Sequence, residues 1–405
     1  MLDLAEFSND PFLARETLSA RLKNTGSASE RATLHYRLWE MCQACGDEPA
    51  ALKHLDTAMT LDPVQHPRCS NETAKRRVVV LNVPGSFQAN APIAMLMDGE
   101  TDLYTMWVSG DPAKRAMLTA TLKKLCPEAV ILAMGEDERQ MPAILEAEAI
   151  ARGSGVPVIN RAGPIMGVGR SLVPKLLASI PDVMVPSCHT ITAPFTDLPP
   201  FPLLVRPVSS HAGNALAKID DQIIFDRYMQ ENVTHGQYYV TQFVDYASAD
   251  GLYRKYRVVF IDGVPYPVHL AIHADWAIWY YNARMEVFPE RRSEESRFMQ
   301  DMTSYFPATV VKGLEEIGQK VGLDYFGLDF GVLQNGTLVV FEVETAMIVH
   351  DRDPADIFPY KKACIARIRQ AFEDMIDQRA QAWAMNAERA VSSTHDLSVM
   401  PSTSL

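Results

Sequence analysis

The hydrophobic positions divide the chain into a helical beginning and a longer part rich in strand patterns. Up to about residue 65 the apolar residues recur every three or four positions, which is typical of amphipathic helices. From Val78 onward, short apolar runs alternate with helical patterns, as expected for a parallel sheet covered by helices. These runs predict strands at 78–81, 130–133 and 156–159, with a helix over 137–152 that ends at Gly153.

The second half of the chain has the pattern of an antiparallel sheet. Asp262-Gly263 separates two strand-like runs and is a typical hairpin turn. A helical pattern over 311–321 ends at a glycine, and a long helical region follows Asp353. The predicted strands of this half are 203–205, 238–243, 257–261 and 264–272.

The helical beginning contains one 34-residue pattern between positions 32 and 65. Its markers are Leu38, Trp39, Gly46-Asp47, Ala51, Ala58 and Pro63. The pattern resembles one tetratricopeptide repeat. Because a single repeat cannot bury both of its faces, residues 1–70 are expected to cap the next domain or to present a surface to a protein partner or another copy.

The most informative passage is the predicted hairpin at 326–345. Asn335-Gly336 predicts a two-residue type I′ turn, in which both central residues have positive φ. Counting back from a Gln334–Thr337 pair places Asp329 directly opposite Glu342. Glu344 lies on the same face, because side chains alternate along a strand. The other members of this face would be Leu333, Leu338 and Val340.

Three carboxylates on one apolar face repel one another unless a cation compensates them. Magnesium prefers carboxylate oxygens, keeps several waters and commonly bridges nucleotide phosphates. We therefore expect Asp329, Glu342 and Glu344 to bind magnesium. The alternative is a solvated sheet edge with salt-bridge partners.

Several common nucleotide-binding motifs are missing from the sequence. Asp329-Phe330-Gly331 spells the metal-binding triplet of protein kinases, but the chain has no H-R-D-x-x-x-x-N loop and no glycine-rich loop before a V-A-I-K strand. It also has no G-x-x-x-x-G-K-[ST] segment, which excludes a P-loop.

The strand pattern at 203–205 continues into a cation and a loop of small residues. Arg206 stands at the end of the strand, and the loop over 208–214 reads Val-Ser-Ser-His-Ala-Gly-Asn. Small residues let backbone N–H groups approach phosphate oxygens, whose charge the cation neutralises. By itself the segment fits a plain surface turn equally well.

The order of these parts resembles the ATP-grasp superfamily over residues 78 to about 385: basic strand, small-residue loop, a strand ending at 242–245, then the carboxylate hairpin. The resemblance implies a mixed α/β and α+β multidomain chain that holds ATP between two α+β subdomains. The implied domains are a helical segment 1–70, an α/β domain 78–160, a small subdomain 161–250, a large subdomain with the metal site 251–388, and a disordered tail 390–405.

The resemblance also assigns roles to individual residues. Arg206 matches the strand lysine that contacts the phosphates, and Arg170 matches the first nucleotide-contacting lysine. The metal ligands would be Asp329, Glu342 and Glu344. The loop that covers the phosphates would include Ser209, Ser210, Gly213 and Asn214, and the hinge strand at adenine would include Gln242, Phe243, Val244 and Asp245.

Three positions depart from the family pattern. Arginine replaces lysine at 170 and 206, which keeps the positive charge on a bulkier, planar group. Glu344 stands where the family usually has asparagine, so the expected metal site gains a carboxylate.

The implied activity is an ATP- and magnesium-dependent ligation of an amino acid or peptide. A substrate carboxylate would attack the γ-phosphate, and an amine would displace the resulting acyl phosphate to form an amide bond. Arg257 is expected to stabilise the acyl phosphate, and His269 and His273 to orient a carboxylate or transfer a proton. The alternatives are a small-molecule kinase and a non-catalytic nucleotide-binding partner protein.

Composition narrows the partners further. The 405 residues carry 38 Lys and Arg against 50 Asp and Glu, a net charge of −12, which argues against a nucleic-acid-binding surface. No apolar run approaches the ~18 residues that span a bilayer, and the acidic N-terminal stretch lacks the features of a secretory signal. Together with six sparse cysteines, this predicts a cytoplasmic protein with reduced thiols and no membrane contact.

Overall fold

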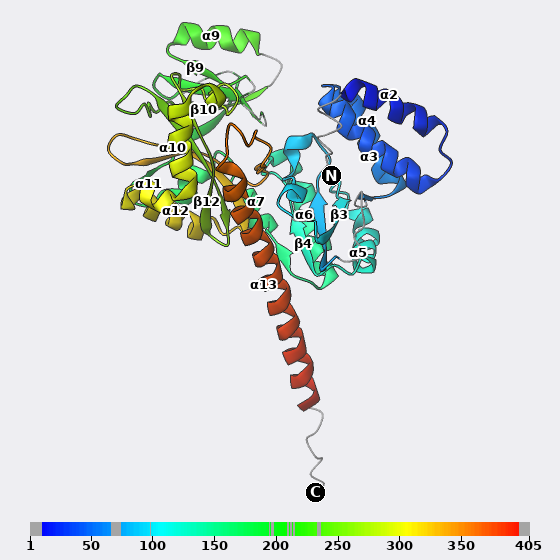
Figure 1. Cartoon of the computed structure of the whole chain (residues 1–405). Coiled ribbons are helices and arrows are strands. Elements are labelled where there is room, and N and C mark those ends of the chain that lie inside the picture. Colours follow the sequence, from blue (N-terminus) through cyan, green and yellow to red (C-terminus); the bar gives the residue numbers. More distant parts are fainter. Residues whose placement is uncertain are drawn as a thin grey trace.

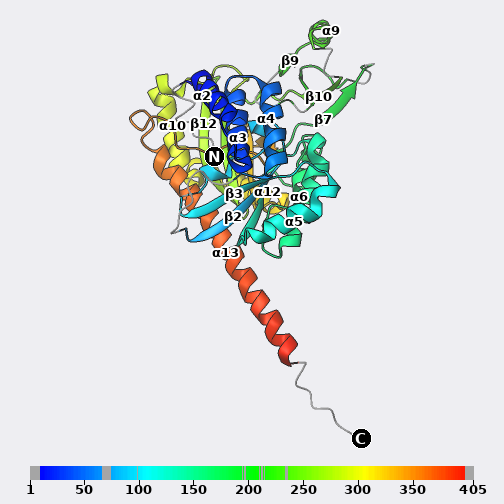
Figure 2. The ribbon, with the colours of Figure 1, turned by 90° about the vertical axis from the view of Figure 1, so that its right-hand side faces the viewer.

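The computed structural model consists of a helical segment, three sheets and a long projecting helix (Figures 1 and 2). It describes residues 10–65, 74–97, 99–193, 195, 198–208, 210, 213, 215–232 and 236–396, with side chains described up to residue 386.

The helical segment comprises α2 (Pro11–Lys23), α3 (Ala28–Ala44) and α4 (Glu48–Leu61). Each helix is capped by a side-chain oxygen that accepts backbone N–H groups, from Asp10, Ser27 and Asp47 respectively. The segment docks on the next domain through Trp39, whose ring lies 5.0 Å from that of Trp107. Its identity as a tetratricopeptide repeat stays a prediction.

The second part is a five-stranded sheet in the order β1-β3-β2-β4-β5. Its strands pair in parallel, except that β1 runs antiparallel to β3. Helices α5 (Arg115–Lys124) and α6 (Met141–Ser154) pack beside it, and α6 ends at Gly155 with φ +78° rather than at Gly153. The strands are β1 (Val64–Gln65), β2 (Arg76–Asn82), β3 (Thr101–Trp107), β4 (Ala129–Leu132) and β5 (Val158–Ile159).

The third part is a four-stranded antiparallel sheet in the order β7-β10-β8-β9, with α9 (Gln222–Glu231) beside it at the top of Figure 1. It has a separate small core that includes Val205, Phe225 and Tyr238. The strands are β7 (Cys188–Thr192), β8 (Leu203–Pro207), β9 (Ala217–Ile219) and β10 (Gln237–Gln242).

The fourth part is a five-stranded sheet in the order β12-β11-β13-β14-β6. The strands are β11 (Tyr253–Ile261), β12 (Val264–His273), β13 (Tyr325–Val332), β14 (Leu338–Glu344) and β6 (Val183–Met184). Since β6 pairs in parallel with β14, residues 183–184 belong to this sheet and not to the small subdomain assigned to 161–250. The helices are α7 (Ala162–Gly167) and α8 (Val173–Leu177), which precede β6, and α10 (Pro289–Gln300), α11 (Met302–Tyr305) and α12 (Ala308–Val321).

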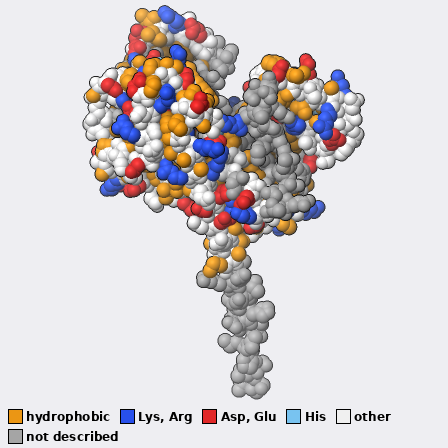
Figure 3. Space-filling model, viewed as in Figure 1, with side chains coloured by type: hydrophobic (Ala, Val, Ile, Leu, Met, Phe, Trp, Pro, Cys, Tyr) orange, Lys and Arg blue, Asp and Glu red, His pale blue; other side chains and the backbone are white. Residues whose placement is uncertain are grey.

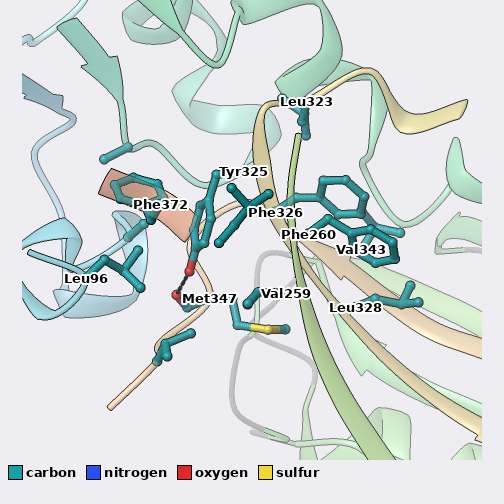
Figure 4. Packing of buried hydrophobic residues seen from close by; sticks show 14 of the residues in the cluster. Leu96, Val259, Phe260, Leu323, Tyr325, Phe326, Leu328, Val343, Met347 and Phe372 are labelled. Atoms are coloured by element: carbon teal, nitrogen blue, oxygen red, sulfur yellow. Dashed lines mark hydrogen bonds between the residues drawn. The ribbon is translucent and has the colours of Figure 1, made fainter. Parts of the chain in front are cut away.

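One hydrophobic core joins the second and fourth parts. Figure 4 shows Phe260 stacked on Phe326, with ring centroids 4.4 Å apart. Nearby, the Tyr325 hydroxyl donates a hydrogen bond to the Met347 carbonyl at 3.2 Å, and Phe372 packs edge-on against the Tyr325 ring. This shared core places the end of the parallel sheet beside the carboxylate hairpin.

Helix α13 (Lys361–Asp396) begins in this core and then leaves the body (Figure 2). Phe372, Met375 and Ile376 are buried, whereas Trp383 is 48% exposed on the projecting part. The helix covers residues 390–396, where a disordered tail was expected, and residues 397–405 lie outside the described part. No helix in the described part is both long and apolar enough to cross a membrane.

Candidate active site

The carboxylate hairpin has a different turn from the one expected, yet keeps its central pair. Leu333 N–H donates to the Thr337 carbonyl at 2.9 Å, so the loop has three residues, with Gly336 at φ +86°. Val332 therefore pairs with Leu338, one residue away from the predicted register. A bulge at Phe341 restores the register, and Asp329 lies opposite Glu342 as predicted.

Because the pairing differs from the predicted one, the carboxylate face contains other residues than expected. Val340 pairs with Phe330 and Leu338 with Val332, so both lie on the opposite face of the sheet from Asp329. Gly331 lies on the Asp329 face, where an added Cβ would approach Phe341 and Tyr246 to 2.9 Å.

Titratable side chains form one row across four adjacent strands. His269 on β12 pairs with Arg257 on β11, Arg257 pairs with Asp329 on β13, and Asp329 pairs with Glu342 on β14. Glu344 lies on the same face of β14, two positions further along. The row brings a predicted catalytic arginine and histidine beside the predicted metal ligands.

Asp329 is bound by two cations from β11. Arg257 holds it in a two-pronged ion pair, with Nε–Oδ1 at 2.7 Å and Nη2–Oδ2 at 2.9 Å, and Lys255 Nζ lies 2.7 Å from Oδ2. Although Asp329 is only 1% exposed and burial favours the neutral acid, these cations hold its pKa well below the ordinary value. Asp329 is therefore ionised at neutral pH.

Glu342 is bound by Arg170, which lies between the short helices α7 and α8. Burial favours the neutral acid, but the Arg170 guanidinium overcomes this effect and lowers the pKa of Glu342. Arg170 thus reaches the carboxylate face of the sheet as a cation, 172 residues away from its partner in the chain.

The pKa values of Glu344 and Glu136 are raised instead of lowered. Burial and then the neighbouring Glu342 raise the pKa of Glu344 to about 8, against a partial opposing effect of Arg257. Burial and Glu342 also raise the pKa of Glu136, which follows β4 and accepts hydrogen bonds from the Thr345 N–H and hydroxyl at 3.1 Å each. This part of the site has fewer cations than carboxylates.

Arg206 brings a further cation from the small sheet. It is 9% exposed, and its Nε donates to the Ser210 hydroxyl at 2.9 Å. Burial, followed by repulsion from Arg170, lowers its pKa to about 10, so it remains charged at neutral pH. Ser210 and Gly213, which has φ +74°, lie in the expected phosphate loop, whereas Ser209 and Asn214 lie outside the described residues.

The expected hinge begins at the end of β10 and precedes β11 in the chain, so it connects the four-stranded sheet to the sheet of the carboxylate hairpin. Gln242 Nε2 donates to the Pro202 carbonyl at 3.0 Å, and the Phe243 ring packs 5.7 Å from Trp276 and beneath Lys218 Nζ. Val244 and Asp245 follow, and Asp245 accepts the Ala247 N–H at 3.1 Å. Binding of adenine at this segment stays a prediction.

The two histidines differ in their surroundings. The His269 ring lies 4.7 Å from that of Tyr280, and burial followed by Arg257 lowers its pKa well below the ordinary value. It is therefore a neutral base at pH 7. His273 accepts the Asp275 N–H at 3.0 Å in the turn after β12, outside the row of charged residues.

Sequence reasoning missed Lys255, Glu136 and Lys361 as members of the site. Lys255 could have been found, because it precedes Arg257 by two positions and so shares its face. Glu136 follows a predicted buried strand, the usual position of site residues in parallel sheets. Lys361 lies near His269 and pairs with Asp353 at 2.8 Å, a contact that no local pattern indicates.

The chemistry of the carboxylates fits a hard divalent cation. Glu342, Glu344 and Glu136 share the Arg170 charge, and the raised pKa values of Glu344 and Glu136 show incomplete compensation. Nevertheless, within the described ranges no three His, Cys, Asp or Glu side chains are grouped closely enough to hold a metal as they stand. Binding by all three predicted ligands therefore requires side-chain rearrangement.

Comparison with known proteins gave structural matches only. No family model and no curated protein matches the sequence. The D-alanine–D-alanine ligase from Bacillus anthracis complexed with ATP is 13% identical, with 78% of this chain and 100% of that chain covered and a TM-score of 0.45. VanG D-Ala:D-Ser ligase from Enterococcus faecalis is 12% identical, with 74% of this chain and 99% of that chain covered and a TM-score of 0.44. A RimK domain ATP-grasp protein from Sphaerobacter thermophilus is 16% identical, with 75% of this chain and 99% of that chain covered and a TM-score of 0.42. All three TM-scores are below 0.5, so this likeness assigns no function to the chain.

Proposed function

We propose that this protein is an ATP- and Mg²⁺-dependent ligase that joins a carboxylate to an amine, with an amino acid or peptide as substrate. The observation that carries the proposal is the row His269–Arg257–Asp329–Glu342, flanked by Lys255, Arg170 and Arg206. Arginine and lysine from three separate segments thus converge on one buried carboxylate and its half-buried neighbours, an arrangement suited to a metal-bound triphosphate.

Arg170 and Arg206 would bind the phosphates of ATP. Arg206 lies on β8 next to Ser210 of the small-residue loop, and its charge is repelled by Arg170. An anion between the two guanidinium groups would relieve this repulsion. The hinge at Gln242, Phe243, Val244 and Asp245 would hold the base, as the family resemblance implies.

Asp329, Glu342 and Glu344 would hold magnesium, which neutralises phosphate charge during phosphoryl transfer. Arg170 would leave Glu342 for the phosphates, freeing a carboxylate oxygen. Arg257 and Lys255 lie on the same face of the sheet and would position the substrate carboxylate and the acyl phosphate oxygens. Since His269 is neutral at pH 7, it can accept a proton from the incoming ammonium.

The test is an assay for ADP release with ATP, Mg²⁺ and a panel of amino acids and short peptides. A ligase should release ADP in proportion to a new amide bond detected by mass spectrometry. A stable phosphorylated product with no amine incorporated would identify a kinase instead. Failure of ATP to bind with magnesium in calorimetry would overturn both.

A further inference from the structure

A cavity lies at the junction of the helical segment, the parallel sheet and the chain that follows the carboxylate hairpin. It has a volume of about 260 Å³ and is lined by Trp39 of α3, Asn82 of β2, Trp107 of β3, and the segment from His350 to Arg352. Asn82 and Trp107 are the last residues of two parallel strands, where α/β proteins bind small ligands.

Two polar atoms of these residues have unsatisfied hydrogen-bonding capacity. Trp107 is 2% exposed, and both its Nε1 and the Oδ1 of Asn82 are buried without a hydrogen-bond partner. Buried polar groups are normally paired, because an unpaired group loses its hydrogen bonds to water without replacing them. One of these atoms is a hydrogen-bond donor and the other an acceptor, and both belong to residues that line the cavity, although neither is exposed to it as it stands.

A positively charged side chain also lines the cavity. The Arg352 guanidinium makes no ion pair or hydrogen bond that the structure records among the described residues, although Arg352 lines the cavity. Arg369, in contrast, is fixed to Asp351 at 2.7 Å and to the Met95 carbonyl at 2.9 Å. Arg352 is therefore the cation available for a carboxylate.

The apolar walls are aromatic. Trp39 and Trp107 meet nearly perpendicularly, with an interplanar angle of 79°, and their rings can cover an aliphatic stem. Because Trp39 belongs to the helical segment, this segment closes the cavity as well as covering the sheet.

We infer that this cavity binds an α-amino acid or the end of a short peptide. A carboxylate would meet Arg352, and a shift of the lining side chains would bring the indole N–H of Trp107 and the Oδ1 of Asn82 within reach of the ligand. The choice of amino acids over other zwitterions rests on the proposed function, whereas binding itself requires neither ATP nor the reaction.

The test is titration of the full chain, without nucleotide, with the common amino acids and a set of dipeptides. Calorimetry and tryptophan fluorescence report binding, since Trp39 and Trp107 line the cavity. We expect at least one ligand to bind with a Kd between about 1 μM and 1 mM. Arg352→Ala and Trp107→Phe should each weaken it about tenfold or more.

Matched variants control for charge and for loss of an indole. Arg227→Ala removes an exposed arginine from α9, and Trp383→Phe removes an exposed indole from α13; both should bind like the parent protein. Circular dichroism checks that each variant is folded. If no amino acid or dipeptide binds at about 10 mM, or if binding is insensitive to both cavity variants, the inference is wrong.

The two proposals can fail independently. An Asp329→Asn variant should lose ATP turnover and still bind the amino acid. If binding depends on Arg352 but the protein never turns over ATP, amino-acid binding in the cavity is supported and the ligase proposal is contradicted. If the protein turns over ATP but shows no such binding, the ligase proposal is supported and amino-acid binding in the cavity is contradicted.

Discussion

Asp329 and Glu342 lie directly opposite each other on paired strands, and each carboxylate is bound by a cation from a different part of the chain. Arg257 reaches Asp329 from the neighbouring strand, and Arg170 reaches Glu342 from the connection between two short helices. Two like charges at this spacing repel one another, so the cations are what make the pair compatible with burial.

Asp329→Asn is expected to reduce ADP release by a factor on the order of 100 or more, because it removes a proposed metal ligand and leaves Arg257 and Lys255 without their counter-charge. Activity measurements with saturating ATP and Mg²⁺ test this. The control is Asp356→Asn, which changes an exposed carboxylate outside the row and should retain full activity. Full activity in Asp329→Asn would show that the hairpin is not the reaction centre.

Arg170→Ala should weaken ATP binding by about ten- to a hundredfold, since it removes a cation from the expected phosphate site. Arg170→Lys keeps the charge and should recover most of the affinity. Calorimetry with ATP and Mg²⁺ measures both. Arg161→Ala, which removes an arginine paired with Glu148 at 3.3 Å, is the matched control and should bind ATP normally. Equal affinity in Arg170→Ala and the parent protein would exclude Arg170 from the nucleotide site.

The contribution of Glu344 to stability without metal should fall as the pH rises from about 4.5 to about 8, opposite in sign to the contribution of His269, whose pKa is lowered. The folded-state pKa of Glu344 is raised from 4.5 to about 8, so in this range the folded chain binds more protons than the unfolded chain. Urea unfolding at several pH values measures the slope of the free energy of unfolding against pH. Glu344→Gln should make this slope less negative than in the parent protein, and Mg²⁺ should stabilise the parent protein at pH 8 more than it stabilises Glu344→Gln. An unchanged slope in the variant would contradict the assignment.

Gly318→Ala should destabilise the fold by about 1–3 kcal/mol, because its Cβ would overlap the Gly263 carbonyl oxygen in the turn between β11 and β12. Thermal and urea unfolding measure the loss. Gly163→Ala, in the short helix α7, meets nothing within 4 Å and should change the free energy of unfolding by less than about 1 kcal/mol. Similar stabilities for the two variants would contradict this close packing.

The errors in the hairpin prediction show how far local pattern reasoning reaches. The Asn335-Gly336 dipeptide indicated a turn at the right place, but the loop has three residues, and only the bulge at Phe341 returns Asp329 to Glu342. Bulges depend on packing against other elements, here the contact of Phe341 with Tyr246 at a ring distance of 4.8 Å. A two-residue periodicity cannot indicate such an insertion.

The sequence by itself determined the alternation of faces, the hairpin, and the acids and bases available on each strand, because these follow from backbone periodicity over a few residues. Through a family resemblance it also indicated Arg170 and Arg206 as candidate nucleotide-binding residues. Only the tertiary structure decided that Arg170 binds Glu342, that Lys255 shares Asp329, and that Glu136 lies near Glu342. These contacts join segments separated by tens to hundreds of residues, and their electrostatics depend on burial, which arises when separate sheets share one core.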